Sequence, residues 1–221
     1  MKPEAVIFDL DGTLIDNNSY HIEAWKVFYT QHGLEFSMDD YRNNINGKIN
    51  ADIFNYVLKT NLTAEDLEKY SNEKEKLYRE LYAEDIRPIH GLLGFLDKLK
   101  DAGIMMAIAT SGIPINIDFM FQHIMMREYF SAVVNATHIS NGKPHPEIFL
   151  KAAMAANANP ANCVAFEDSV AGIRSAKAAG MTVIALATTH KREELHEADL
   201  IIDDYTDVDI STLEKLMDRN S

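Results

Sequence analysis

The sequence predicts an α/β fold, in which helices cover both faces of a parallel β-sheet and a helical domain is inserted near the N-terminus. Short apolar, β-branched runs alternate with helical patterns along most of the chain. These runs are apolar throughout, which is expected for strands that are buried on both faces. One long interval, from about residue 17 to residue 88, contains no convincing strand and several amphipathic helical stretches.

Six segments have the composition of β-strands. Each of the first five precedes a turn and a helical stretch, and this order is typical of βαβ units in a parallel sheet. We therefore expect a doubly wound, Rossmann-like sheet. The predicted strands are residues 5–9, 106–110, 132–134, 163–167, 182–186 and 200–202.

The strandless interval contains three predicted helices. Thr63 precedes the third with acidic residues in the first turn, which is a typical helix start because a hydroxyl can cap the free amides. We expect residues 1–16 and 89–221 to form a catalytic core domain and residues 17–88 to form a helical cap domain. The predicted helices are residues 20–32, 51–59 and 64–82.

Composition and charge exclude several classes of protein. The apolar fraction is 47% and the charged fraction 25%, as in ordinary soluble proteins. The formal charge of -13 disfavours a nucleic-acid or anionic-membrane partner. The first apolar run is interrupted by Asp9 and Asp11, unlike a signal peptide, and the single Cys163 excludes an internal disulfide. We expect a cytoplasmic monomer.

Two carboxylates stand at the end of the first predicted strand. Asp9 and Asp11 are two residues apart, so both can point to the same side of an extended chain. Gly12 allows the chain to turn closely past a ligand. The carboxyl ends of parallel strands are where open α/β sheets bind ligands. Taken alone, the pair is also compatible with a calcium-like loop or a solvated turn.

A second acidic pair ends another predicted strand. If the strands before Glu167-Asp168 and before Asp9 are neighbours, four carboxylates meet at one edge of the sheet. Such a cluster repels itself unless a cation neutralises it. Carboxylate, carbonyl, water and phosphate oxygens are the ligands that Mg²⁺ prefers. The sequence therefore predicts a magnesium site, although the second pair alone could be an acidic helix N-terminus.

Two further segments can bind a phosphate group. Thr110 and Ser111 close the second predicted strand with hydroxyls and backbone amides that lead into a helix, a natural anion site. Lys143 lies just before Pro144 and a predicted helix. We expect these three residues to bind phosphate. The alternatives are that Thr110 satisfies the backbone at a strand end and that Lys143 is a solvated loop lysine.

These motifs together resemble a known family. Residues 8–14 (FDLDGTL), Thr110-Ser111, Lys143-Pro144 and Glu167-Asp168 are similar, in order and spacing, to the four motifs of the haloacid dehalogenase superfamily. The resemblance covers essentially the whole chain. The helical insertion resembles the cap of the branch that includes beta-phosphoglucomutase and many sugar-phosphate phosphatases.

The resemblance implies a role for each residue at the sheet edge. Asp9 would attack phosphorus and form an aspartyl-phosphate intermediate. Asp11 would protonate the leaving oxygen and then deprotonate the attacking water. Mg²⁺ would be held by the Asp9 carboxylate, the Asp11 carbonyl and Asp168, with help from Glu167. The metal ion and Lys143 would neutralise the phosphoryl oxygens.

The helical insertion carries candidate substrate residues. His21 and Trp25 are four residues apart and therefore lie on one helical face. In the resemblance this face points to the active site, with His21 near Asp11, and Lys74 corresponds to a cap lysine of the mutase branch. The alternatives are a half-buried face of a cap helix for the first two residues and a solvated helix lysine for the third.

One departure from the mutase pattern bears on the reaction. Asn50 occupies a position where the mutase-like pattern has an arginine, which suits the binding of a second phosphate. Lys48, two residues away, can compensate in part. We therefore expect a phosphatase that acts on a small phosphorylated metabolite such as a sugar phosphate, with a mutase as the alternative. Asp11 disfavours dehalogenation, because a halide needs no proton, and the two intact aspartates disfavour a non-catalytic sensor.

Overall fold

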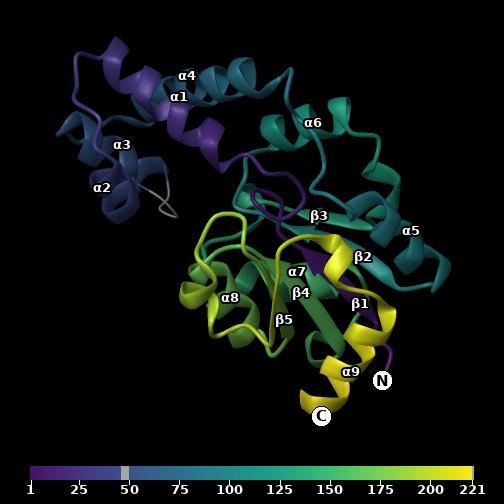
Figure 1. The fold of residues 1–221 in the computed structure, drawn as a ribbon. Coiled ribbons are helices and arrows are strands. Elements are labelled where there is room, and N and C mark those ends of the chain that lie inside the picture. The colour runs from purple at the N-terminus through teal and green to yellow at the C-terminus, as the bar shows by residue number, and fades with distance from the viewer. Residues whose placement is uncertain (46–49, 221) are drawn as a thin grey trace. The chain divides into compact units, whose positions relative to one another are not determined.

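The structure, a computed structural model, describes residues 1–45 and 50–220, without the side chains of residues 43, 50–52 and 220. The chain forms two compact units (Figure 1). The core unit comprises Met1–Asp16 and Arg87–Ser221, and the helical unit comprises Asn17–Ile86.

The core unit is built on a six-stranded sheet in the order β3-β2-β1-β4-β5-β6 (Figure 1). Every neighbouring pair is parallel, which confirms the predicted parallel sheet. Only the first two strands differ from prediction: β1 ends one residue earlier, and β2 begins and ends one residue earlier. The strands are β1 (Ala5–Phe8), β2 (Met105–Ala109), β3 (Ala132–Val134), β4 (Cys163–Glu167), β5 (Thr182–Leu186) and β6 (Leu200–Ile202).

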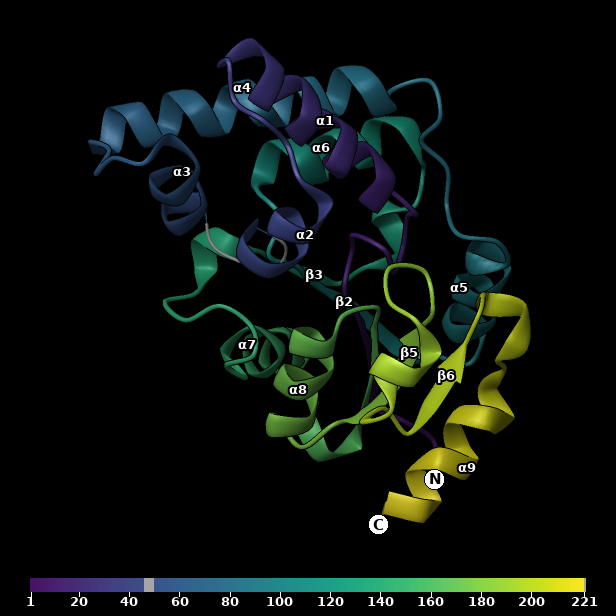
Figure 2. The ribbon, with the colours of Figure 1, turned by 60° about the vertical axis from the view of Figure 1, so that its left-hand side comes forward.

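Helices cover both faces of this sheet, as expected for a doubly wound fold. Figure 2 shows α7 and α8 on one face and α5 and α9 on the other. The first face is rich in buried alanine, which allows helices to approach closely. On the second face the rings of Phe8, Phe166, Phe95 and Tyr205 pack against one another. The helices are α5 (Leu92–Asp101), α6 (Pro114–His123), α7 (Glu147–Ala155), α8 (Val170–Ala178) and α9 (Ile210–Asn220), with 3₁₀ turns at Arg127–Tyr129, Ala136–His138, Pro160–Asn162, Arg192–Leu195 and Tyr205–Asp207.

The helical unit has an aromatic core of its own. Trp25, Phe28 and Phe54 are buried in it. Helices form in all three stretches that the sequence predicts, and Thr63 caps the third by accepting from the Asp66 amide at 3.1 Å. A short helix and a π-helix were not predicted. The elements are α1 (Asn18–Gln31), α2 (Met38–Asp40), the π-helix Tyr41–Ile45, α3 (Asn50–Leu58) and α4 (Ala64–Tyr82).

Within the described part of the chain, no helix is both long enough and apolar enough to cross a lipid bilayer. Cys163 is fully buried at the start of β4, where its Sγ lies 3.3 Å from the carbonyl oxygen of Asn159. Burial raises the pKa of this thiol to about 12, as expected for a structural thiol and not for a nucleophile.

Candidate active site

The site lies at the carboxyl ends of three adjacent strands. β1 pairs with β4 and with β2, so that Phe8 lies opposite both Phe166 and Ile108. The residues that follow these positions therefore meet at one edge of the sheet. This pairing satisfies the condition on which the predicted cluster depends, because the strands that precede the two acidic pairs are neighbours.

Lys143 joins two of the predicted carboxylates. Its Nζ lies 2.5 Å from Asp9 Oδ1 and 2.5 Å from Glu167 Oε1. The lysine side chain is only 9% exposed. Burial by itself lowers the pKa of the lysine, but the two carboxylates outweigh this effect and raise the pKa above its ordinary value. Lys143 is therefore a buried ammonium group and not a solvated loop lysine.

Asp9, Glu167 and Asp168 can hold a metal ion together. All three are buried, and each offers a carboxylate oxygen within 4.8 Å of the others. Burial raises the pKa of Asp9 and of Asp168, and the Glu167 carboxylate raises both further. Lys143 acts to lower both pKa values, but it does not cancel the effect of burial. The donor set, oxygen atoms with an excess of negative charge, fits a hard divalent cation.

Gly12 lets the chain pass close to this cluster. Its φ is +73°, and a Cβ atom at this position would come 2.1 Å from Asp168 Oδ2. The Gly12 carbonyl accepts from Thr188 Oγ1 at 2.5 Å, and a hydrogen bond from Thr189 acts to lower the pKa of Asp168. These two threonines were not predicted from the sequence. The signal was present, because both follow β5 at the same edge of the sheet.

Both oxygens of the Glu167 carboxylate have polar partners. Oε2 accepts hydrogen bonds from the Asp168 amide, the Ser169 amide and the Ser169 hydroxyl, each at 2.9 Å. The same hydroxyl caps α8 by accepting from the Gly172 amide at 3.1 Å. Glu167 is therefore more than an acidic residue at a helix N-terminus, because its other oxygen pairs with Lys143.

The second aspartate lies beside the predicted phosphate turn. A Cβ atom on Gly112 would be 3.6 Å from Asp11 Oδ2, which places the Asp11 carboxylate next to residues 110–112. Thr110 is buried, and its hydroxyl accepts from the Gly112 amide at 2.9 Å. Thr110 thus satisfies a backbone amide of the turn at the strand end, which is one of the two roles predicted for it. Ser111 is exposed. Phosphate binding by these residues stays a prediction.

In the helical unit, Lys74 is part of a buried polar network. Its Nζ lies 2.8 Å from Glu75 Oε1 and 2.8 Å from His21 Nδ1. The His21 ring in turn stacks on Tyr78, with ring centroids 3.9 Å apart. The side chain of Lys74 is only 6% exposed, so the lysine is not a solvated helix lysine.

Of the other three predicted substrate residues, the structure describes the side chain of Trp25 alone. Trp25 is buried and packs against Phe28 and Phe54 in the core of the helical unit. Lys48 lies outside the described residues, and so does the side chain of Asn50. The substrate-binding roles of these residues stay predictions.

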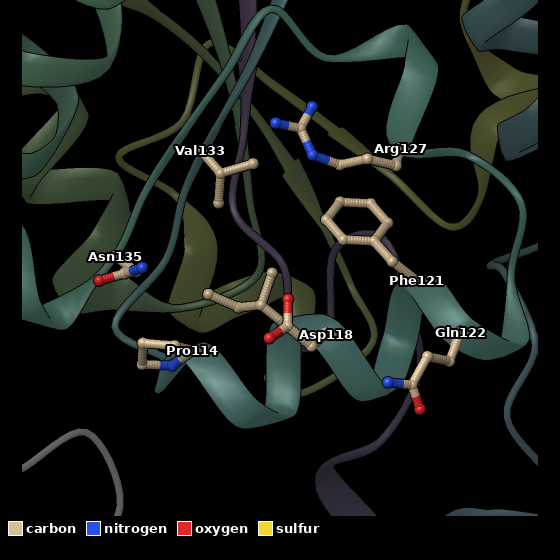
Figure 3. Close-up of a pocket in the computed structure, with 8 residues that line it drawn as sticks. Pro114, Asp118, Phe121, Gln122, Arg127, Val133 and Asn135 are labelled. Carbon is tan, nitrogen blue, oxygen red and sulfur yellow. The ribbon is translucent and has the colours of Figure 1, made fainter.

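A separate cavity of about 460 Å³ lies between α6 and the edge strand β3 (Figure 3). Its lining includes the Phe121 ring, the Arg127 guanidinium and the Asp118 carboxylate. Arg127 donates to the Phe130 carbonyl at 2.7 Å. The two charged groups are opposite in sign and solvent-exposed, and none of the predicted site residues whose side chains the structure describes lines this cavity.

Comparison with known proteins assigns the chain to a family. The model of the haloacid dehalogenase-like hydrolases matches residues 6–186. A beta-phosphoglucomutase of Bacillus subtilis is 30% identical over 219 residues, which cover 95% of this chain and 93% of that protein. A fructose-1-phosphate phosphatase of Escherichia coli is 30% identical over 181 residues, covering 81% of this chain and 94% of that protein.

A solved structure shows the same relationship. A haloacid dehalogenase-type hydrolase from Entamoeba histolytica superposes with a TM-score of 0.90 at 31% identity, covering 97% of this chain and 99% of that one. The chain belongs to the haloacid dehalogenase-like hydrolase family. The resemblance that the four motifs indicate is therefore confirmed, and the protein is an enzyme of a hydrolase family.

Proposed function

We propose that this protein is a magnesium-dependent phosphatase that hydrolyses a small phosphorylated metabolite, in particular a sugar phosphate, through an aspartyl-phosphate intermediate. The observation that carries the proposal is the buried cluster of Asp9, Lys143, Glu167 and Asp168. It combines a carboxylate nucleophile, a cation for phosphoryl oxygens and a metal-binding set. The named functions of the relatives, which include a phosphatase of phosphorylated carbohydrates from Thermotoga maritima, support the substrate class.

In the first half of the reaction, an Asp9 carboxylate oxygen attacks phosphorus. The bond between phosphorus and the substrate oxygen breaks, and Asp11 gives its proton to that oxygen as it leaves. Lys143 already pairs with Asp9, so its ammonium group can stabilise negative charge first on the carboxylate and then on the phosphoryl oxygens. The products of this half are the dephosphorylated metabolite and phosphorylated Asp9.

In the second half, water attacks the phosphorus of the aspartyl-phosphate. Asp11, now ionised, takes a proton from that water, the bond between phosphorus and the Asp9 oxygen breaks, and inorganic phosphate leaves. Both aspartates return to their starting protonation states, so the cycle is balanced with water as the only co-substrate.

A metal ion fits the residues that remain. The Asp9 and Asp168 carboxylates and the Asp11 carbonyl would hold Mg²⁺, with Glu167 assisting. When bound, the ion supplies Lewis-acid stabilisation of the phosphoryl oxygens and balances the cluster's negative charge. Thr110 and Ser111 would complete the phosphate site.

The part of the substrate that does not react would be recognised by the helical unit, acting as a cap. The proposed residues are His21, Trp25, Lys74, Asn50 and Lys48. We further propose that the enzyme works in the cytoplasm as a monomer, without nucleic-acid or membrane partners.

A mutase remains the competing proposal, because a beta-phosphoglucomutase matches nearly the whole chain. In a mutase the phosphoryl group on Asp9 passes to a second hydroxyl of the sugar and not to water. The enzyme must then hold a bisphosphate, and the neutral Asn50 is less suited to that task than an arginine.

One experiment separates the two proposals. Phosphate release is measured over a panel of phosphorylated metabolites with MgCl2 and after EDTA treatment, beside a coupled assay for conversion of beta-glucose 1-phosphate to glucose 6-phosphate. We expect magnesium-dependent phosphate release from at least one sugar phosphate to exceed isomerisation. Faster isomerisation would establish the mutase, and tight sugar-phosphate binding without turnover would indicate a sensor.

A further inference from the structure

The segment that carries Lys143 has little regular structure of its own. The described residues 139–146 form neither helix nor strand, although the lysine at their centre makes two contacts of 2.5 Å. The backbone of an irregular segment is held by side chains or by water. The position of the Lys143 ammonium group therefore depends on the contacts that fix this loop.

Glu147, the first residue of α7, makes most of these contacts. One or both of its carboxylate oxygens accept from the Ser140 amide at 3.1 and 3.2 Å, from the Asn141 amide at 2.9 Å and from Asn141 Nδ2 at 3.1 Å. Lys151 Nζ donates to the same carboxylate at 2.7 Å. These bonds tie the start of the loop to a rigid helix.

The other end of the loop is fixed by a second helix. The buried Ser175 on α8 donates to the His145 carbonyl at 2.7 Å. The His145 amide donates to the Gly142 carbonyl at 3.0 Å, which closes a tight turn around Lys143. Glu147 and Ser175 thus hold the loop on either side of the lysine.

We propose that Glu147 is a positioning residue, which holds the loop so that the Lys143 ammonium group reaches Asp9 and Glu167. The expected effect of Glu147 on turnover rests on the proposed phosphatase function. Its effect on the position of Lys143 is independent of that function. Glu147 itself does not touch the carboxylate cluster through any contact among the described residues, so it acts through Lys143.

The donors around Glu147 require a carboxylate. Two backbone amides, the Asn141 side-chain amide and the Lys151 ammonium group all present hydrogen atoms to it. A glutamine at this position keeps the size but replaces one acceptor oxygen with a donor, which would face other donors. The Glu147→Gln variant should therefore release the loop without creating a cavity.

Glu4 provides a matched control. Its carboxylate also accepts from a loop amide, that of Asn159 at 2.8 Å, and from an asparagine side chain, that of Asn162 at 2.8 Å. It precedes β1 and lies at the opposite end of the strand from Asp9. Glu4→Gln makes the same chemical change away from the site.

The first test compares turnover. We expect Glu147→Gln to lower kcat about 10- to 100-fold, because small displacements of catalytic groups have effects of this size. Glu4→Gln should change kcat less than about twofold, as expected for a group that touches no reacting atom. In the Lys143→Ala background, Glu147→Gln should cause almost no further loss, because the residue acts through the lysine. An undiminished loss in that background would overturn the proposal.

The second test needs no activity. Limited acetylation with acetic anhydride, read by peptide mass spectrometry, reports the accessibility of Lys143 relative to the exposed Lys76. We expect Lys143 to be protected in the wild type and in Glu4→Gln, and to react at least fivefold faster in Glu147→Gln. Equal protection in all three proteins would overturn the proposal. A wild type that protects Lys143 but releases no phosphate would refute the phosphatase function alone.

Discussion

Gly172 lies directly against the carboxylate of Glu167, and a Cβ atom at position 172 would fall 1.7 Å from Glu167 Oε1. The same oxygen pairs with Lys143 Nζ. The absence of a side chain on the first turn of α8 therefore makes room for the buried carboxylate that orients the lysine. This contact links the packing of a helix to the geometry of the proposed phosphoryl-transfer site.

We predict that Gly172→Ala lowers both stability and activity. The added methyl group must displace Glu167 or the helix, which costs about 1–3 kcal/mol of unfolding free energy in a packed interior. Moving Glu167 also moves Lys143, so kcat should fall at least tenfold. Thermal unfolding and phosphate release measure the two effects.

Gly94→Ala is the control for this substitution. Gly94 is also inside a helix, α5, but a Cβ atom there would meet nothing within 4 Å. Both variants gain helix propensity, so Gly94→Ala should be more stable than the wild type by about 0.5–1 kcal/mol and equally active. Similar behaviour of the two variants would contradict the role given to the Gly172 contact.

The sheet and the location of the carboxylate cluster could be predicted from sequence, because both follow from local pattern. Fully apolar runs predict buried parallel strands, and the carboxyl ends of such strands meet at one edge of the sheet. Asp9 and Glu167 stand at two of these ends, and β1 and β4 are indeed neighbours. Neither feature depends on side-chain packing.

Contacts that depend on tertiary packing could not be predicted. Glu147 has the sequence signature of an ordinary acidic residue at a helix start, and only the folded loop shows the amides that it accepts from. Thr188 and Thr189 reach the site from β5, two strands away from β1. Apolar character alone is also a poor guide to burial, because Met125 is 92% exposed.

Asp9→Asn tests the nucleophile. An amide does not attack phosphorus, so we expect turnover to fall by at least about 10³-fold. The fold should be retained, because asparagine has the size of aspartate and removes one negative charge from a repulsive cluster. Circular dichroism and phosphate release provide the two measurements. Near-normal phosphate release by a folded Asp9→Asn protein would rule out the aspartyl-phosphate mechanism.

Asp11→Asn tests the general acid. Loss of its proton should damage the reaction most for substrates whose leaving group is a poor one, by roughly 10²–10⁴-fold for an alkyl phosphate. The nitrophenolate leaving group of p-nitrophenyl phosphate needs little protonation, so the rate of the first half-reaction should fall less for this substrate. The comparison is made on burst kinetics, which isolate formation of the intermediate. An equal loss for both substrates would contradict this role for Asp11.

Metal-free protein should lose stability as pH rises. Burial raises the pKa of Asp9 from 3.8 to about 8, and the pKa of Asp168 shifts in the same direction. A folded-state pKa above the unfolded value means that the folded protein binds more protons. The contribution of these two carboxyl groups to the free energy of unfolding is therefore fully present below about pH 4 and is lost as pH rises through about 8. Lys143, with its pKa raised further above 10.5, stays charged throughout this interval.

Magnesium should reverse this trend, because the ion competes with protons for the same oxygen atoms. At a concentration 100 times its Kd it adds about 2.7 kcal/mol, or roughly 5–10 °C in Tm for a chain of this size. We expect the gain in Tm from MgCl2 to be larger at pH 8 than at pH 5, and to shrink in Asp168→Asn, which removes one ligand. A gain that is independent of pH, or unchanged in Asp168→Asn, would contradict the assignment of this cluster as the metal site.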